Sequence, residues 1–231
     1  MTEELFIPSA AAKPLVRIVD DDAKVRKSEA FVLSIEGWDI AAYETAEAFL
    51  EGDDPTRPGC IVLDVRMPGM SGLELQAELI RLGRTTPVLF LSGHGDIGMA
   101  VLALKRGASD FLQKPIIPEK LQAAVARLVR WHQQICRSLE ERQRTLELVS
   151  ALTPRELEVA RLAAKGLSSR EIAQVLGSAE QTVKQQRSTA LHKLDARGPM
   201  ELADIFRIAD EPIDVRAPLG SIDEAAAGGG Q

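Results

Sequence analysis

The stretch CIVLDVRMPGMSG, residues 60–72, combines an apolar run, an acid at its end and a Pro-Gly turn. Residues 61–63 form the kind of apolar run that fills the interior of a parallel sheet, and Asp64 follows them directly. A carboxylate at the mouth of an apolar strand costs free energy unless another group there uses its charge. The stretch therefore predicts a functional site at the carboxyl end of a buried strand.

Similar apolar runs precede and follow this strand, and amphipathic stretches separate them. Strands that alternate with helices predict an α/β fold, in which a doubly wound parallel sheet is covered by helices on both faces. The site of such a fold lies at the carboxyl ends of its strands. The expected strands are residues 15–20, 38–43, 60–64, 87–92 and 109–113, and the expected helices lie around residues 24–35, 45–51, 72–82 and 96–106.

A long helix is expected next, because neither Gly nor an internal Pro interrupts residues 118–150. Its seam residues follow one another at alternating four- and three-residue steps, which is a heptad pattern with two polar interruptions. The pattern predicts a linker helix over 121–150 that can pair as a coiled coil; a final helix of the α/β domain followed by a flexible linker is the alternative. The seam consists of Leu121, Val125, Leu128, His132, Ile135, Leu139, Arg142, Leu146 and Val149.

Residues 151–210 predict a separate all-helical domain of four helices. The sequence from Thr153 to Glu156 is a capping box with Pro at the first helical position. A second capping box, from Ser178 to Gln181, is expected to open a helix over 178–194, and Pro199 to begin the last helix. Residues 211–231 contain Pro, Gly, Ala and acids without apolar periodicity, so we expect a disordered tail.

Composition limits the class of protein. At 231 residues the chain is long enough for one large domain or two small ones, and its net charge of −6 excludes a generally basic nucleic-acid coat. Its two cysteines, Cys60 and Cys136, lack metal-ligand spacing and are expected to be reduced core thiols. The chain has no membrane-span candidate and no secretion-signal pattern, so we expect a cytoplasmic protein without a membrane partner.

An acidic cluster is expected at one edge of the sheet. The first expected strand ends in Asp20, Asp21 and Asp22, and the third ends in Asp64. Like charges ~4 Å apart repel by ~4 kcal/mol at an effective dielectric of 20, so three or four converging carboxylates need a cation or raised pKa values. Oxygen ligands suit Mg²⁺ or Mn²⁺ better than zinc. A solvated helix N-cap is the alternative role for an isolated Asp triplet.

Two more polar groups lie at the ends of the fourth and fifth expected strands. Ser92 places a hydroxyl after the fourth expected strand, and Lys114 places an amine after the fifth. Acids, metal, hydroxyl and amine at one edge predict a phosphoryl-binding site with Asp64 as the nucleophile.

The motifs of residues 15–120 resemble those of a two-component receiver domain. They are VDDD (19–22), LDVRMPGMSG (63–72), FLSGHGD (90–96) and FLQKP (111–115). The resemblance implies strand order 2-1-3-4-5 and Asp64 as the phosphoacceptor. It also implies a Mg²⁺ (or Mn²⁺) ion held by the side chains of Asp20, Asp21 and Asp64 and the backbone carbonyl of Arg66.

The same resemblance assigns the switch residues. Ser92 is the switch hydroxyl, Lys114 is the phosphate-binding amine, and the Lys114–Pro115 peptide bond is expected to be cis. Phe111 occupies the position of the aromatic switch residue, where the family often has Tyr, so no reorienting phenol is available.

Residues 152–197 resemble a LuxR-type helix-turn-helix domain through LTPRE, GLSSREIAQVLG, TVK and HKL. A receiver followed by this domain is the layout of the NarL/FixJ response regulators, and the long helix favours the FixJ-type branch. The implied layout is an N-terminal extension (1–14), receiver (15–120), linker helix (121–150), DNA-binding domain (151–210) and tail (211–231). The implied base contacts are Lys184, Gln185 and Ser188, and the implied phosphate contacts are Arg170, Thr182 and Arg187.

The resemblance implies a transcriptional regulator that a sensor histidine kinase phosphorylates and that binds promoter DNA as a homodimer, with RNA polymerase as a further partner. It implies no enzyme beyond self-phosphorylation from a phosphodonor and slow autodephosphorylation. Two alternatives stay open. One is a receiver that controls a protein-interaction module, because residues 151–210 carry nine Lys/Arg against eight Asp/Glu and Gln185 and Gln186 depart from the family pattern. The other is a Mg²⁺-dependent phosphotransferase.

Overall fold

The computed structural model describes residues 6–93 and 109–216, which form two compact units. Of the described residues, the first unit contains 6–93, 109–137 and 214–216, and the second is Ser138–Ile213. The helix expected at residues 96–106, the first five residues of the N-terminal extension and residues 217–231 of the expected tail lie outside the described residues.

The first unit is built on a parallel sheet of strand order β2-β1-β3-β4-β5, as the sequence predicts. In the register of this sheet, Val19 pairs with Leu63, so Asp20 and Asp64 leave neighbouring strands at the same edge. The strands differ from the expected ranges by one residue at most. They are β1 (Leu15–Val19), β2 (Asp39–Tyr43), β3 (Gly59–Asp64), β4 (Val88–Ser92) and β5 (Asp110–Gln113).

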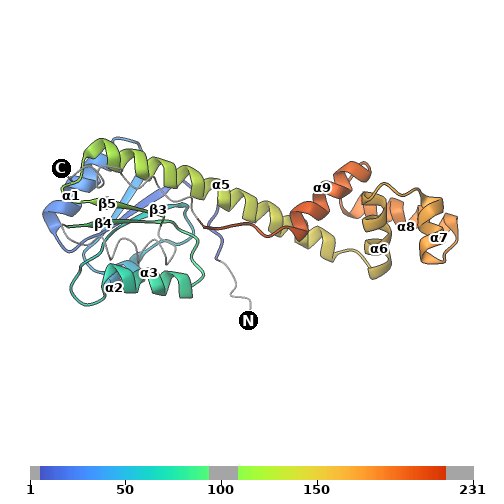
Figure 1. The fold of residues 1–231 in the computed structure, drawn as a ribbon, viewed down its shortest axis with the longest axis horizontal. Coiled ribbons are helices and arrows are strands. Elements are labelled where there is room, and N and C mark those ends of the chain that lie inside the picture. The colour runs from blue at the N-terminus through green and yellow to red at the C-terminus, as the bar shows by residue number, and fades with distance from the viewer. Residues whose placement is uncertain (1–5, 94–108, 217–231) are drawn as a thin grey trace, which may run out of the picture. The chain divides into compact units, whose positions relative to one another are not determined.

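Helices cover both faces of the sheet (Figure 1). On one face α1 (Ala23–Ser34) and the first half of α5 (Pro118–Ser150) bury Leu33, Leu121 and Leu128 against the sheet. On the other face α2 (Ala46–Gly52) and α3 (Gly72–Arg81) form a second core with the sheet. The sheet is therefore buried on both faces, which agrees with its continuous apolar strands. Cys60 and Cys136 are buried free thiols, as expected.

Helix α5 spans the whole expected linker, and most of its seam is buried. In the first unit Leu121, Val125 and Leu128 pack into the core that α5 shares with the sheet, and His132 is fully buried. The next buried position is Cys136 rather than the expected Ile135. Packing within the chain thus occupies these seam positions, so a coiled-coil partner would have to use other positions of α5.

The second unit is helical and closely follows the sequence prediction. The capping box of Thr153 and Glu156 is present, and Gly177 ends a helix in the left-handed conformation. The capping box expected at Ser178 is wrong: the helix begins one residue after Ala179 without a side-chain cap, because the Ser178 hydroxyl accepts a hydrogen bond from Arg155 instead. The helices are α6 (Pro154–Ala164), α7 (Ser169–Leu176), α8 (Glu180–Lys193) and α9 (Pro199–Asp210).

A search of the described helices for a membrane span finds none with the length and apolar character that crossing a bilayer requires.

Candidate functional site

Asp20, Asp64 and Lys114 meet at the carboxyl edge of the sheet. The Lys114 ammonium donates hydrogen bonds to Asp20 Oδ2 at 2.6 Å and to Asp64 Oδ1 at 2.8 Å. Asp20 is 1% exposed and Asp64 8% exposed, whereas Lys114 is partly buried. The three residues come from three strand ends that the topology brings together, as the sequence predicts.

The carboxylates of Asp20 and Asp64 keep the Lys114 amine protonated. Burial raises the pKa of the Asp64 carboxyl above its usual value, and the hydrogen bond and charge of Lys114 act in the opposite direction. Burial also disfavours the charged form of Lys114, but its hydrogen bonds to Asp20 and Asp64 outweigh burial and raise its pKa. Lys114 is therefore a fixed cation beside the expected phosphoacceptor.

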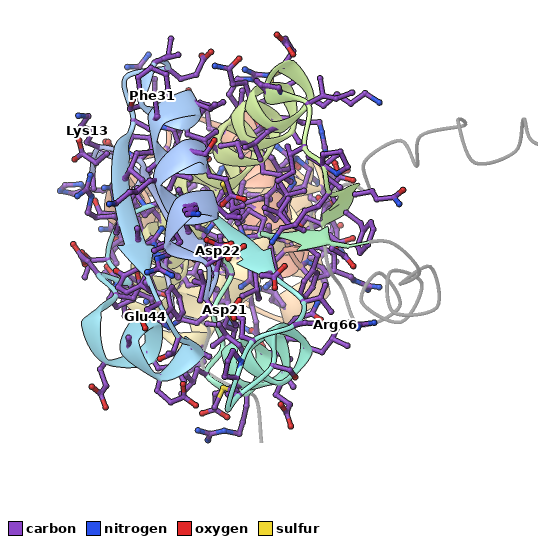
Figure 2. The ribbon with its side chains drawn as sticks, turned by 90° about the vertical axis from the view of Figure 1, so that its left-hand side faces the viewer. Lys13, Asp21, Asp22, Phe31, Glu44 and Arg66 are labelled. Atoms are coloured by element: carbon purple, nitrogen blue, oxygen red, sulfur yellow. The ribbon has the colours of Figure 1, made fainter. Side chains whose placement is uncertain are left out.

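The other acids of the DDD triplet take different positions. Asp22 is the N-cap of α1 and accepts hydrogen bonds from the backbone of Lys24 and Val25, which lower its pKa. Asp21 is exposed and lies beside it at this edge of the sheet, which faces the viewer in Figure 2. Two carboxylates therefore meet here, not the three or four that the sequence suggested. Within residues 6–93 and 109–216 no three acidic, His or Cys side chains gather as a metal site.

The oxygen donors nevertheless suit a hard divalent ion. The remaining oxygens of the two buried acids accept backbone hydrogen bonds, Asp20 Oδ1 from Asp22 at 2.8 Å and Asp64 Oδ2 from Arg66 at 3.2 Å. Asp21 and Arg66 are both exposed and lie on the face of the molecule that Figure 2 shows. The donors are carboxylates and backbone carbonyls, which are the ligands that Mg²⁺ prefers. The chemistry of the donor set fits Mg²⁺ once the ammonium gives up its bonds to the acids.

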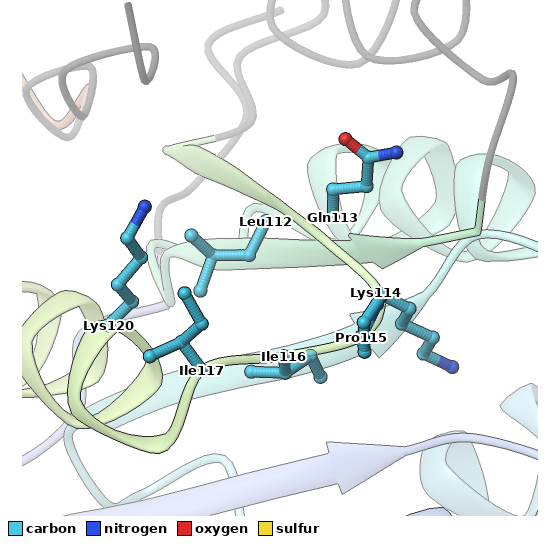
Figure 3. Close-up of a pocket in the computed structure, with 7 residues that line it drawn as sticks. All are labelled: Leu112, Gln113, Lys114, Pro115, Ile116, Ile117 and Lys120. Atoms are coloured by element: carbon cyan, nitrogen blue, oxygen red, sulfur yellow. The ribbon is translucent and has the colours of Figure 1, made fainter. Parts of the chain in front are cut away.

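The residues expected to act as switches lie on β4 and β5. Ser92 is buried, and its hydroxyl lies 3.3 Å from the backbone oxygen of Gly93. Phe111 is partly buried and packs against the core under α2 and α3. The Lys114–Pro115 bond is cis, as predicted. The segment that follows lines a pocket of 290 Å³, from which the side chains of Lys114 and Lys120 extend in opposite directions (Figure 3).

Two residues of α1 next to the site were not predicted. Arg26 donates a hydrogen bond to the backbone oxygen of Asp20 at 2.6 Å. Glu29 is 4% exposed, and neither of its carboxylate oxygens has a hydrogen-bond partner. The sequence signal for Glu29 is its spacing from buried Leu33, four residues later on the same face of the helix.

The second candidate site is the outer face of α8. Val183, Ala190 and Leu194 are buried in the core of the second unit, which fixes the opposite side of the helix as its solvent face. Lys184 pairs with Glu180 one turn earlier at 2.8 Å. Of the expected DNA contacts, Arg187 is partly buried, and the exposed ones are Arg170, Thr182, Lys184, Gln185 and Ser188.

Comparisons with known families match both units. Residues 16–126 match the model of the response regulator receiver domain, and residues 150–206 match that of the bacterial regulatory proteins of the luxR family.

The chain is also similar to curated proteins and to a solved structure over most of its length. Nodulation protein W of Bradyrhizobium diazoefficiens is 40% identical over 205 residues, which cover 87% of each chain. The transcriptional regulatory protein FixJ of Azorhizobium caulinodans is 37% identical over 88% of this chain and 97% of its own. The solved structure of the response regulator StyR is similar with a TM-score of 0.77 at 39% identity, covering 85% of this chain and 99% of that one.

Proposed function

The chain belongs to the NarL/FixJ-type response regulators, which join a receiver domain to a LuxR-type DNA-binding domain, and from this premise we propose that Asp64 is its phosphoacceptor. The protein is a transcriptional regulator controlled by phosphorylation. The phosphodonor is the phosphohistidine of a sensor histidine kinase. A carboxylate oxygen of Asp64 attacks the phosphorus, the phosphorus–nitrogen bond breaks, and the imidazole keeps the electron pair.

The single observation that carries this proposal is the bond between Lys114 and Asp64. An ammonium 2.8 Å from Asp64 Oδ1 is placed to neutralise the phosphoryl oxygens that arrive there. Buried Ser92, at the end of β4, supplies a hydroxyl for the same oxygens. Phe111 is the second residue of the neighbouring strand β5 and has no hydroxyl to reorient, so Ser92 is the main reporter of phosphorylation.

Mg²⁺ (or Mn²⁺) would be held by the side chains of Asp20, Asp21 and Asp64 and by the carbonyl of Arg66. When bound, it neutralises the charge that develops on the phosphoryl oxygens. The chain performs its own phosphorylation from a phosphodonor and a slow hydrolysis of the product. We propose no other catalytic activity for it.

The outer face of α8 would read the promoter. Lys184, Gln185 and Ser188 face base edges in the major groove, and Arg170, Thr182 and Arg187 contact phosphates. The match of residues 150–206 to luxR-family regulators supports this function over a protein-interaction module. The receiver match likewise supports a regulator over a phosphotransferase that acts on small substrates.

Phosphorylation would pair two receivers and bring two DNA-binding domains to adjacent half-sites. Linking the domains raises the effective concentration of the second at its half-site, so the pair binds more tightly than either domain alone. The bound dimer acts on RNA polymerase. Because its target is chromosomal DNA, we place the protein in the cytoplasm, without a membrane partner.

The test uses the full chain with acetyl phosphate and Mg²⁺. Size-exclusion chromatography with light scattering reports dimer formation, and gel shifts against genomic fragments at fixed salt report DNA binding. We expect both to increase in the wild type and to stay unchanged in Asp64→Asn. Phosphodonor-dependent dimers of Asp64→Asn would contradict the role of Asp64, and wild-type dimers without any DNA binding would favour the interaction module.

A further inference from the structure

Glu29 is a buried acid without a hydrogen-bond partner. Its side chain lies on the inner face of α1, and both carboxylate oxygens are enclosed. No other acidic side chain among residues 6–93 and 109–216 is both buried and unpartnered in this way. A buried carboxyl without a hydrogen-bond partner destabilises a fold, and this cost suggests that Glu29 has a function.

Glu29 shares a cavity with Lys114. The cavity has a volume of 240 Å³ and lies between α1, the segment after β5 and the first turns of α5. Its other walls are mainly apolar: Val25, Val32, Pro115, Ile116, Pro118 and Leu121, with Ser28 on α1. Lys114 therefore stands between this cavity and the acids of the phosphorylation site, with open space on the Glu29 side.

The charged groups of the phosphorylation site also act on Glu29. Burial raises the pKa of Glu29 to about 8, the charges of Asp20 and Asp64 raise it as well, and the charge of Lys114 lowers it. With its neighbours in this arrangement, Glu29 is mostly neutral at neutral pH. An ammonium that moved closer would favour the ionised form.

Lys114 and a divalent ion compete for the same oxygens. The ammonium bonds one oxygen of Asp20 and one of Asp64, and the remaining oxygens already accept backbone hydrogen bonds. A divalent ion bound to these carboxylates repels the nearby ammonium and competes with it for their oxygens. A partly buried ammonium that loses such a partner needs another acceptor.

We propose that Glu29 is a positioning residue for Lys114. When Asp20 and Asp64 bind a divalent ion, Glu29 accepts a hydrogen bond from the Lys114 ammonium across the shared cavity. The proposal rests on the proposed function, because that function requires the metal site. The movement needs rotation of the long Lys114 side chain and of the Glu29 carboxylate, because Glu29 lines the cavity while its two oxygens are enclosed. Glu29 then holds the Lys114 ammonium beside the site until the ammonium binds a phosphoryl oxygen.

The test measures Mg²⁺ affinity of the unphosphorylated full chain by isothermal titration calorimetry. We expect Glu29→Leu to bind Mg²⁺ about tenfold more weakly than the wild type, a factor that corresponds to ~1.4 kcal/mol. Glu29→Gln keeps an acceptor oxygen and should restore part of the affinity. Ser28→Ala changes an uncharged wall of the same cavity and should leave the affinity unchanged.

A double-mutant cycle separates this role from a general effect of charge or folding. In a Lys114→Ala background the ammonium is absent, so Glu29→Leu should change Mg²⁺ affinity by less than twofold. Glu29→Leu should also raise the urea midpoint of the metal-free protein, because it removes a buried unpartnered carboxyl. Weaker metal binding together with higher stability is not the result of a purely structural role.

Two results would overturn the proposal. Equal loss of Mg²⁺ affinity in both backgrounds, or no loss in either, would remove the coupling between Glu29 and Lys114 and leave Asp64 phosphorylation untouched. Absence of Mg²⁺ binding in the wild type would contradict the proposed metal site and this proposal together.

Discussion

The backbone N–H of Gly59 donates to His132 Nδ1 at 2.9 Å, which ties α5 to the start of β3 across 73 residues of sequence. On the other side of the ring, His132 Nε2 lies 3.1 Å from Thr85 Oγ1. His132 Nδ1 also lies 3.0 Å from the backbone oxygen of Gly59, so either neutral tautomer bonds Gly59 on one side of the ring and Thr85 on the other. This polar residue of the expected heptad seam thus fixes α5 on its own receiver, which sets where the rest of the helix leaves the sheet.

Replacing His132 by Ala should lower the free energy of unfolding of the first unit by about 2 kcal/mol, because buried partners on Gly59 and Thr85 lose their hydrogen bonds. Both tryptophans, Trp38 and Trp131, lie in this unit, so urea unfolding followed by tryptophan fluorescence reports on it.

Low pH should destabilise the first unit through protonation of His132. Burial lowers the pKa of His132 from 6.5 to about 4, so the unfolded state binds the proton more tightly. The wild type should therefore lose stability as the pH falls from 6.5 to 4, relative to the Ala variant. A parallel pH dependence of both proteins would show that His132 is not buried as described.

Glu29 should give the opposite pH dependence. Burial raises its pKa from 4.5 to about 8, so the folded state holds the proton more tightly than the unfolded state. The wild type should lose stability relative to Glu29→Gln as the pH rises from 4.5 to 8, with a slope of up to ~1.4 kcal/mol per pH unit. Fluorescence-detected urea titrations across this range measure the difference, and a constant difference would mean that Glu29 is solvated.

Gly72 should be intolerant of a side chain because of Asp64. A Cβ at Gly72 would lie 2.2 Å from the backbone oxygen of Asp64. Gly72→Ala should therefore shift the end of β3, destabilise the first unit by about 1–3 kcal/mol and slow phosphorylation by acetyl phosphate. Gly93→Ala is the control, since no atom of the described residues lies within 4 Å of its added Cβ. Equal behaviour of the two variants in unfolding and phosphorylation assays would refute the close approach at Gly72.

Substitutions on the DNA-binding unit should separate base contacts from phosphate contacts. Arg170→Ala should weaken binding to all DNA sequences alike and reduce the salt dependence by about one counterion. Gln185→Ala should change the preferred sequence at a cost of about 1–3 kcal/mol. Arg207→Ala on α9 removes an exposed cation outside α8 and serves as the control. Gel shifts at several salt concentrations, with selected and random fragments, distinguish these outcomes.

The sheet and the phosphorylation site could be predicted because their signals are local. The strands are short, mainly apolar runs, and Asp20, Asp64 and Lys114 lie at the ends of three of them. Parallel strands end at the same edge, so the order of the strands was enough to bring these residues together.

Other features depend on which of several possible partners a side chain meets in the folded structure. The periodicity of the sequence does not specify that partner. The heptad seam of α5 has the same pattern whether it packs on a second helix or on its own sheet, and here Leu121 and Val125 pack on the sheet. Ser178 has the spacing of a capping residue, yet Arg155 from another helix takes its hydroxyl. Glu29 falls on the buried face of α1, but only the structure shows that no donor meets it.

The most direct test of the account is to locate the phosphoryl group. After incubation of the full chain with acetyl phosphate and Mg²⁺, the acyl phosphate is reduced with borohydride and peptides are sequenced by mass spectrometry. We expect modification at Asp64 alone, and little modification in Lys114→Ala because the cation beside Asp64 is lost. Modification of another aspartate in the wild type, or undiminished labelling of Asp64→Asn, would contradict it.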